Sequence, residues 1–314
     1  MKLIIQIPCL NEESTLPITL ATLPRAVKGF DKVEWLIIDD GSTDQTRQVA
    51  QDHGVDHIVR FGWNQGLARA FSAGLEKSLC EGADVIVNID ADNQYNADDI
   101  PKLTQPILDQ KAEYVVGERP IGDIEHFPAS KKLLQKLGSH VVRKISGVSV
   151  VDAPSGFRAM SRGCATKINV FSSYTYTLET LIQAGQSNIA VISVPIRVNS
   201  DLRPSRLVRG PLSYVGKSVT TIFRIFVVYQ PFKFFFVIGA ALFSLGVILG
   251  IRFLYFFLTG DGSGHIQSVV LSGVFVAIGF QTILVAFLAD LISVNRRLLE
   301  ELVNRGREID VSGS

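Results

Sequence analysis

The sequence has little cysteine and almost no net charge. Cys9, Cys80 and Cys164 are far apart in a chain of 314 residues and lack the close spacing of metal ligands. This favours reduced thiols in a cytoplasmic domain over a disulfide framework. The 31 basic and 30 acidic residues nearly cancel, which argues against a nucleic-acid-binding protein. No internal repeat or low-complexity tract is evident, so a repeat architecture is excluded.

Apolar residues are abundant and concentrated in the last third of the chain. Mean hydropathy is +0.26, and Phe234–Leu258 and Ile266–Ile292 are nearly free of charge, with Arg252 the exception in the first run and Asp290 at the close of the second. Each run is long enough to cross about 30 Å of hydrocarbon at about 1.5 Å per residue. The sequence predicts two transmembrane helices, and a buried helical hairpin of a soluble protein is the alternative.

The distribution of basic residues predicts an orientation. The linker 259–265 has no lysine or arginine, whereas Lys233 precedes the first span and Arg296 and Arg297 follow the second. By the positive-inside rule, both ends of the hairpin face the cytoplasm. The preceding segment, Leu212–Tyr229, is predicted to be an amphipathic helix in the headgroup layer.

The first 120 residues alternate short apolar runs with helical patterns, as in a doubly wound α/β sheet. The run 1–10 is interrupted by Gln6 and ends at Asn11, so a buried first strand is favoured over a signal peptide. The predicted strands are Leu3–Ile7, Glu34–Ile38, His57–Arg60, Val85–Ile89 and Tyr114–Gly117. The predicted helices are Ser14–Leu23, Asp44–His53, Gly66–Leu79 and Asp98–Asp109.

Chemically capable residues follow the predicted strands, at the edge where such sheets bind ligands. Asp90 and Asp92 come directly after the fourth strand. Two carboxylates one residue apart suit a hard divalent cation shared with a diphosphate. Asp92 is the principal metal candidate, with Asp90 and Gln94 as further ligands or as their hydrogen-bonding partners. A single D-x-D pattern occurs by chance in many proteins, so its context matters.

Two further acids lie at the same edge. Glu12 and Asp40 are placed to accept hydrogen bonds from a nucleotide base and ribose. For Asp39 and Asp44, a role in capping the helix that follows Gly41 is the alternative to a contact with the nucleotide. We favour that capping role for Asp44.

Three motifs, taken in order, resemble family 2 of the inverting glycosyltransferases, which have the GT-A fold. They are Ile7-Pro8-Cys9-Leu10-Asn11-Glu12-Glu13, Asp39-Asp40-Gly41-Ser42-Thr43-Asp44 and Asp90-Ala91-Asp92-Asn93-Gln94. The resemblance covers residues 1 to about 210. Asn93 departs from the apolar residue that many relatives carry, and the sequence offers no reason for it.

Three further features narrow the resemblance to polyprenyl-phosphate glycosyltransferases: Gly117-Glu118-Arg119, the segment 152–158 and the two spans. The chain is similar to dolichol-phosphate mannose synthases and to bacterial undecaprenyl-phosphate glucosyltransferases. The resemblance implies Mg²⁺ or Mn²⁺ and transfer of a hexose to a polyprenyl phosphate with inversion, with glucose from UDP-glucose favoured. The alternatives are a GDP-mannose-dependent synthase and a non-catalytic membrane scaffold. A processive polysaccharide synthase is disfavoured because the chain lacks a Gln-x-x-Arg-Trp signature. The implied nucleotide-binding residues are Pro8, Leu10, Asn11, Glu12, Asp39, Asp40, Asp90 and Ala91.

The acceptor of such an enzyme is a phosphate monoester, which is largely a dianion near neutral pH because its second pKa is about 6. Cationic positioning therefore matters more than a general base. The acceptor-phosphate candidates are Arg119, Ser130, Lys131, Arg203 and Arg206. Asp152 matches the family's reaction-centre aspartate, where it would orient the acceptor, bind sugar hydroxyls or act as a base; a turn-capping aspartate is the alternative. Phe157 and Arg158 are predicted to brace that loop.

The expected organisation is a GT-A catalytic domain (1–210), an amphipathic juxtamembrane helix (211–232), a transmembrane hairpin (233–292) and a cytoplasmic tail (293–314). The resemblance implies a multi-pass protein of the inner or plasma membrane, with the catalytic domain and both termini cytoplasmic. It also implies a homo-oligomer, a tetramer in relatives, and Gly239, Gly246 and Gly250 allow close helix approach.

Overall fold

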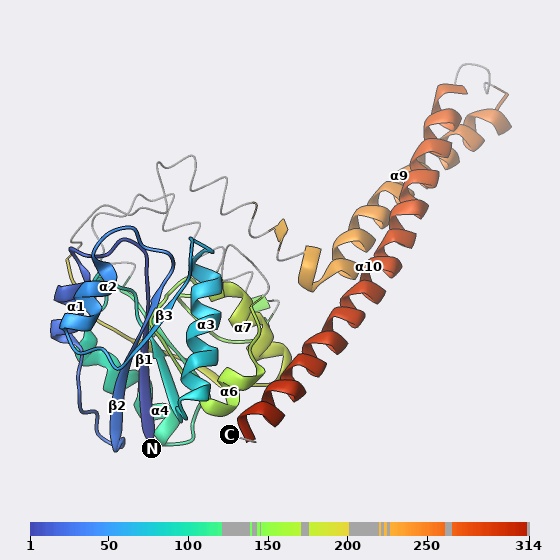
Figure 1. The fold of residues 1–314 in the computed structure, drawn as a ribbon. Helices are drawn as coiled ribbons and strands as arrows, with labels where there is room; N and C mark the ends of the chain where they lie inside the picture. The colour runs from blue at the N-terminus through green and yellow to red at the C-terminus, as the bar shows by residue number, and fades with distance from the viewer. Residues whose placement is uncertain are drawn as a thin grey trace. The chain divides into compact units, whose positions relative to one another are not determined.

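The described part of the chain folds as two units. The computed structural model describes residues 1–120, 139, 143, 144, 146–170, 176–200, 220, 223, 224, 227–260 and 266–312. One unit comprises residues 1–219 with 303–314, and the other comprises 220–302. The first contains an α/β sheet and the second contains two long helices (Figure 1).

The described residues of the first unit form a seven-stranded sheet in the order β3-β2-β1-β4-β6-β5-β7. β6 is antiparallel to its neighbours β4 and β5, whereas the other pairs are parallel. The strands are β1 (Lys2–Cys9), β2 (Lys32–Asp39), β3 (His57–Arg60), β4 (Val85–Asn88), β5 (Tyr114–Glu118), β6 (Arg158–Ser161) and β7 (Val191–Pro195).

Helices cover both faces of the sheet (Figure 1). They are α1 (Leu16–Thr22), α2 (Thr46–Asp52), α3 (Leu67–Cys80), the 3₁₀ turn η1 (Ala97–Asp99), α4 (Ile100–Leu108), α6 (Arg162–Lys167) and α7 (Tyr176–Gln186). Leu3, Ile5 and Ile7 of β1 share one core with α1, α2 and α4. The opposite face of β1 meets α3, where Gln6 lies against Gly74. Both faces are buried, which explains why the strand sequences are continuously apolar.

The predicted elements are confirmed, with small shifts at their ends. The helix expected over Asp98–Asp109 begins as the turn η1 and continues as α4. The antiparallel β6 was not foreseen. Its four residues have no apolar run of their own, and its place in the sheet depends on pairing with strands about 45 and 70 residues earlier.

The strand order creates a switch point between β1 and β4. From β1 the chain proceeds to β2 and β3 on one side, and β4 lies on the other. Ligands of doubly wound sheets bind beyond the carboxyl ends of the strands at such a point. Because β6 is antiparallel and Asn88 pairs with Arg158, the segment that precedes Arg158 reaches the same edge.

A buried carboxylate lies at the opposite, amino-terminal edge. Glu34 near the start of β2 forms ion pairs with Lys2 Nζ at 2.6 Å and Lys32 Nζ at 2.5 Å, and it lies 2.8 Å from His57 Nε2. Burial by itself raises the pKa of Glu34, but these three partners outweigh burial and lower it to about 2. The ionised carboxylate therefore stabilises the fold.

We expect Glu34→Gln to lower the free energy of unfolding by about 2–3 kcal/mol at pH 7. The folded-state pKa lies below the unfolded value, so this stabilisation is present above about pH 4.5 and disappears as the pH falls toward 2. Denaturant titrations of both proteins at a series of pH values measure the difference. Asp109→Asn, at a surface ion pair, serves as the control and should lower the free energy of unfolding far less than Glu34→Gln. A Glu34→Gln deficit that persists unchanged at pH 2.5 would contradict the assignment.

The second unit contains α9 (Pro231–Leu258) and most of α10 (Ile266–Ser312), whose residues from 303 onward are assigned to the first unit. Pro231–Leu258 and Ile266–Arg296 are long and apolar enough to cross a membrane, and their most apolar windows are only 11% and 17% buried. A core helix of a soluble protein would be mostly covered, so this exposure disfavours the buried-hairpin alternative. α10 continues without a break past Ile292 through the segment expected to be a tail.

Small residues bring α9 and α10 together. A methyl group built on Gly239 would lie 2.8 Å from Ile283, and one on Gly246 would lie 2.7 Å from the Val276 backbone nitrogen. Ser272 Oγ donates a hydrogen bond to the Gly246 carbonyl at 2.7 Å. The close approach that these glycines allow is therefore used inside the hairpin. The predicted amphipathic helix Leu212–Tyr229 lies largely outside the described residues.

Candidate active site

The loops after β1 and β2 are joined by hydrogen bonds. Asn11 N donates to Ser42 Oγ at 3.0 Å, and Thr43 N donates to Asn11 Oδ1 at 2.8 Å. Asn11 has φ of +54°, a left-handed conformation that asparagine tolerates better than most residues. The backbone of Glu12 donates to Thr46 Oγ1 at 2.7 Å. The two predicted nucleotide-binding motifs therefore form one platform at the carboxyl edge.

Glu12 and Asp44 have different surroundings on this platform. The Glu12 carboxylate is buried and accepts a hydrogen bond from Thr15 Oγ1 at 2.6 Å. Asp44 accepts hydrogen bonds from Thr46 N at 3.0 Å and from Glu13 N at 3.2 Å. Asp44 thus joins the first residue of α2 to the first loop, although the N-cap position of α2 is Gln45.

Asp39 and Asp40 organise the loops around them. Asp39 is buried, accepts a hydrogen bond from Ser42 N at 2.8 Å and lies 3.5 Å from Arg60 Nε. The Asp40 carboxylate accepts hydrogen bonds from the backbone N–H groups of Gln65 and Gly66 at 2.7 and 2.9 Å. Burial raises the pKa of Asp40 above its usual value, although these two hydrogen bonds oppose it.

The D-x-D segment leaves β4 at the centre of the edge. Asp92 Oδ1 accepts a hydrogen bond from Gln94 N at 3.2 Å. Asn93 between them has φ of +57°, and its carbonyl accepts a hydrogen bond from Asn199 Nδ2 at 2.9 Å. A left-handed position favours asparagine over an apolar side chain. This conformation explains the departure at Asn93 that the sequence alone left without a reason.

Asp90 and Asp92 fit a divalent cation. Burial of the Asp90 carboxyl, together with the nearby Asp92 carboxylate, raises the pKa of Asp90 to about 7. Two close acids that repel each other in this way are stabilised by a bound cation. Among the described residues no group of three His, Cys, Asp or Glu side chains could hold a metal ion. Any ion at this pair would therefore take most of its oxygen ligands from substrate and water.

Arg119 and Asp152, predicted as separate site residues, form a bidentate ion pair. Arg119 Nε lies 2.6 Å from Asp152 Oδ2, and Arg119 Nη2 lies 3.0 Å from Asp152 Oδ1. Asp152 is fully buried and the Arg119 side chain is 12% exposed. Burial lowers the pKa of Arg119, but Tyr95 and Asp152 raise it above its usual value. Both carboxylate oxygens of Asp152 bind Arg119, whereas Ser155 N at the turn donates to the backbone carbonyl of Asp152 at 3.1 Å.

Gly156 brings the loop before β6 against the D-x-D segment. Gly156 N donates to Tyr95 Oη at 2.9 Å, and its carbonyl accepts a hydrogen bond from Asn88 Nδ2 at 2.8 Å. A methyl group built on Gly156 would lie 2.7 Å from Asp90 Oδ2. A side chain at position 156 would therefore have to displace the Asp90 carboxylate.

The sequence reasoning overlooked Asn88 and Tyr95. Asn88 pairs in register with Gln6 on β1, and Gln6 Nε2 donates to Asn88 Oδ1 at 2.9 Å. Two polar residues at matching positions of neighbouring apolar strands were a signal available in the sequence. Their hydrogen bond supports the Asn88 amide that holds Gly156.

Arg158 braces the loop, as predicted. Its guanidinium is fully buried and donates to the Ser155 and Ala153 carbonyls, each at 2.6 Å. It also donates to Thr177 O at 2.8 Å and to Thr180 Oγ1 at 2.9 Å. These bonds tie the segment 153–155 to α7 and fix the loop that carries Asp152.

The remaining predicted residues fall into two groups. The first group, which the structure describes, comprises Pro8, Leu10 and Ala91. Pro8 is buried near the end of β1, and Leu10 is the first residue after β1. The Ala91 carbonyl accepts a hydrogen bond from Thr19 Oγ1 at 2.9 Å. Ser130, Lys131, Arg203 and Arg206 lie outside the described residues.

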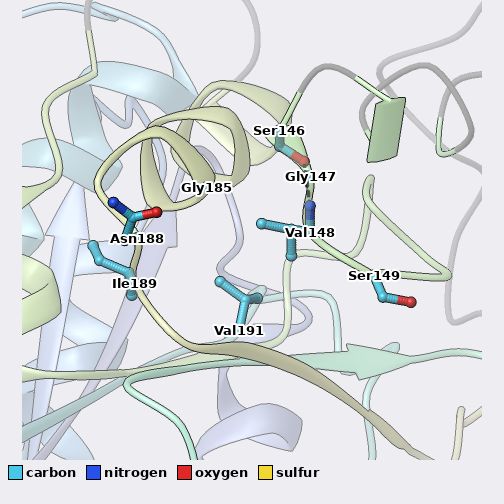
Figure 2. A pocket seen from close by; sticks show the side chains of 8 residues that line it. All are labelled: Ser146, Gly147, Val148, Ser149, Gly185, Asn188, Ile189 and Val191. Atoms are coloured by element: carbon cyan, nitrogen blue, oxygen red, sulfur yellow. Dashed lines mark hydrogen bonds between the residues drawn. The ribbon is translucent and has the colours of Figure 1, made fainter.

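A pocket elsewhere in the first unit is distinct from this edge. Its eight lining residues are Ser146, Gly147, Val148, Ser149, Gly185, Asn188, Ile189 and Val191 (Figure 2). Val191 begins β7, so the pocket lies toward the amino-terminal edge of the sheet. None of the eight residues is ionisable, and nothing in the pocket matches the chemistry gathered at the carboxyl edge.

We expect Gly156→Ala to weaken Mn²⁺ binding about tenfold, because the new methyl group displaces the Asp90 carboxylate and groups that orient metal ligands typically contribute this much. Gly163→Ala is the matched control, since a methyl group there would lie 3.6 Å from its nearest neighbour. Titration of Mn²⁺ followed by electron paramagnetic resonance measures both variants. If Gly156→Ala and the wild type bind Mn²⁺ with equal affinity, Gly156 has no role in the cation site.

The family model for glycosyl transferase family 2 matches residues 4–168, just over half of the chain. The chain belongs to this family. As a family 2 member it is a glycosyltransferase, which is the enzyme class expected from the sequence.

The chain is similar to curated relatives that are named for different sugars. The chain is 29% identical over 236 residues to the undecaprenyl-phosphate mannosyltransferase of Micrococcus luteus, covering 71% of this chain and 93% of that protein. It is 29% identical to the UDP-N-acetylglucosamine–dolichyl-phosphate N-acetylglucosaminyltransferase of Methanococcus voltae, covering 61% and 83%. It is 27% identical to the polyprenol monophosphomannose synthase of Mycolicibacterium smegmatis, covering 60% and 74%.

The fold of this family 2 chain is also that of a solved glycosyltransferase. Glucosyl-3-phosphoglycerate synthase from Mycobacterium tuberculosis, in a crystal structure with Mn²⁺, UDP and glucosyl-3-phosphoglycerate, superposes with a TM-score of 0.54 at 24% identity. The match covers 72% of this chain and 78% of that one. The GT-A fold expected from the sequence is therefore confirmed.

Proposed function

We propose that this family 2 glycosyltransferase transfers a hexose from a nucleoside diphosphate sugar to a polyprenyl phosphate at the cytoplasmic face of the inner or plasma membrane. The proposal rests chiefly on one observation. The Asp90–Asp92 pair, Gly156 and the Arg119–Asp152 ion pair meet at one sheet edge in a chain that also carries two membrane-length apolar helices.

The donor is proposed to bind on the platform made by the first two loops. Glu12 and Asp40 keep carboxylate oxygens that can accept hydrogen bonds from base and ribose, and Asn11 holds the two loops in register. Asp39, which is buried and bonded to Ser42, serves as the support of this platform. Pro8, Leu10, Asp90 and Ala91 are proposed to complete the nucleotide site.

Asp90 and Asp92 are proposed to hold Mg²⁺ or Mn²⁺, with Gln94 as a further ligand or supporting group. The ion would neutralise negative charge on the leaving nucleoside diphosphate. Gly156 leaves room for the Asp90 carboxylate, because a methyl group at this position would lie 2.7 Å from Asp90 Oδ2.

The acceptor phosphate is proposed to approach Arg119. A lipid phosphate oxygen attacks the anomeric carbon, the bond from that carbon to the diphosphate oxygen breaks, and the electron pair leaves with the nucleotide. Direct attack inverts an α-linked donor to a β-linked product. Both Asp152 carboxylate oxygens are engaged by Arg119, and the acceptor needs no base. Asp152 is therefore proposed to orient Arg119 rather than to remove a proton.

The membrane helices are proposed to place this edge near the lipid acceptor, with both termini cytoplasmic as the charge pattern predicts. Ser130, Lys131, Arg203 and Arg206 remain proposed acceptor contacts. The domain limits at 210, 232 and 292 and a homo-oligomeric assembly also remain proposals.

We propose UDP-glucose as the donor and glucose as the transferred sugar, because of the resemblance drawn from the sequence. GDP-mannose is the second candidate, because two of the curated relatives are named for mannose transfer; a third is named for N-acetylglucosamine.

Purified full-length protein in detergent, incubated with undecaprenyl phosphate and a panel of radiolabelled UDP- and GDP-sugars, tests the function. We expect one donor to label the lipid, and a chelator to abolish the labelling. Failure of every donor to label the lipid while nucleotide still binds would refute the transferase proposal and favour a non-catalytic scaffold.

A further inference from the structure

Between β3 and α3 lies an exposed tryptophan that the proposed function leaves without a role. Trp63 is 72% exposed, more than any other large apolar residue among those described in the first unit. A single exposed apolar side chain requires no explanation in itself. Its position relative to the donor platform is what makes it informative.

The Trp63 loop is fixed to the second nucleotide motif. The Asp40 carboxylate accepts hydrogen bonds from the backbone N–H groups of Gln65 and Gly66. Gly41 has φ of +77°, and a methyl group built on it would lie 2.5 Å from the Trp63 carbonyl carbon. Trp63 is therefore held in direct backbone contact with the residue that follows Asp40.

The charges at this edge indicate which partner suits the indole. Asp39 ends β2, Asp40 and Asp44 lie on the loop after it, and Glu13 on the loop after β1 donates its backbone N–H to Asp44. The neighbouring Arg60 lies 3.5 Å from Asp39. This acidic setting disfavours an anionic lipid headgroup. A nucleobase is uncharged and flat, and its N–H groups match carboxylate acceptors.

We propose that Trp63 stacks on the nucleobase of the donor and so contributes to donor affinity. The inference rests on the proposed function, which brings a nucleotide to this edge. It assigns a binding role to a residue outside the three motifs. Base stacking on an aromatic side chain tolerates different bases because every base has a π-face.

The chain has two tryptophans, which allows a direct optical test. Trp35 is 6% exposed and its Nε1 donates to the Pro24 carbonyl at 3.2 Å. Trp35→Phe therefore leaves Trp63 as the sole tryptophan, and Trp63→Phe leaves the buried Trp35; excitation at the red edge of the tryptophan absorption band avoids the tyrosines. With full-length protein in detergent and Mg²⁺, we expect UDP or GDP to quench the tryptophan fluorescence of Trp35→Phe. The tryptophan fluorescence of Trp63→Phe should stay unchanged. If Trp35→Phe fails to fold, the difference between wild type and Trp63→Phe supplies the same signal.

Calorimetry separates stacking from a general effect on structure. Trp63→Ala should raise the Kd of the quenching nucleotide at least about fivefold, and Trp63→Phe should recover most of the affinity. The affinity for Mg²⁺-pyrophosphate, which has no base, should stay unchanged. Ile18→Ala, at a 42% exposed apolar residue of α1, is the control and should bind nucleotide as wild type does.

Several outcomes would overturn the inference. One is that the wild type binds nucleotide but the fluorescence of Trp63 does not change. Another is that Trp63→Ala loses as much affinity for pyrophosphate as for nucleotide. A third is that anionic vesicles alone shift the fluorescence of Trp63. Each of these leaves the transferase function standing. Absence of any nucleotide binding by wild type would overturn both proposals, and nucleotide binding without sugar transfer would overturn the transferase function alone.

Discussion

Asp92→Asn is expected to lower the rate of sugar transfer by about a hundred- to a thousandfold. The substitution removes one of the two charges proposed to hold the cation, and metal stabilisation of a leaving diphosphate is worth several kcal/mol. An asparagine oxygen can still accept the hydrogen bond that Gln94 N makes to Asp92, so the loop should keep its shape. Transfer of radiolabelled sugar to undecaprenyl phosphate measures the effect.

Asp98→Asn is the matched control for this loss of charge. Asp98 lies six residues after Asp92, and its side chain is 77% exposed. The rate of sugar transfer by Asp98→Asn should therefore stay within about twofold of the wild-type rate. Mn²⁺ binding by electron paramagnetic resonance gives a second measurement independent of turnover. Wild-type protein that transfers sugar at full rate after removal of divalent cations would refute the proposed cation site.

Arg119→Ala should be the most destabilising change at the site. It leaves the fully buried Asp152 carboxylate without its bidentate partner, and breaking a buried pair from one side costs about 3–5 kcal/mol. The proposed acceptor contact is lost at the same time. Denaturant titration measures the free energy of unfolding, and the lipid-transfer assay measures activity.

A double variant distinguishes structural damage from a lost acceptor contact. Arg119→Met with Asp152→Leu replaces both charges by apolar groups, which usually restores much of the stability lost by removing one. We expect this variant to recover stability but to remain inactive. Recovery of transfer along with stability would mean that the ion pair only supports the fold.

A second Arg–Asp pair provides the control. Arg197 Nη2 lies 2.8 Å from Asp99 Oδ1, but Lys102 Nζ also lies 2.8 Å from that oxygen and the Arg197 side chain is 54% exposed. Arg197→Ala should therefore destabilise the fold far less than Arg119→Ala and leave transfer unchanged. A large loss of transfer in this variant would show that the assay responds to any damage near the sheet edge.

The doubly wound class, the first five strands and the membrane-length helices followed from the sequence because they depend on local patterns. A strand covered on both faces needs a continuous apolar run, as Leu3–Ile7 shows, and a bilayer sets the length of an apolar helix. The placing of Glu12, Asp40 and Asp90 at one edge followed as well, since all three come after parallel strands. These expectations require no knowledge of which strands are neighbours.

Only the tertiary structure decided which groups touch. The insertion of the antiparallel β6 between β4 and β5 brings Gly156 against Asp90, 66 residues apart in sequence, and joins Arg119 to Asp152 across 33 residues. The left-handed backbone at Asn93 and the contact of Gly41 with Trp63 are likewise products of packing. A local pattern records whether a residue is buried, but it does not record its distant partner, because that contact forms only when the whole sheet assembles.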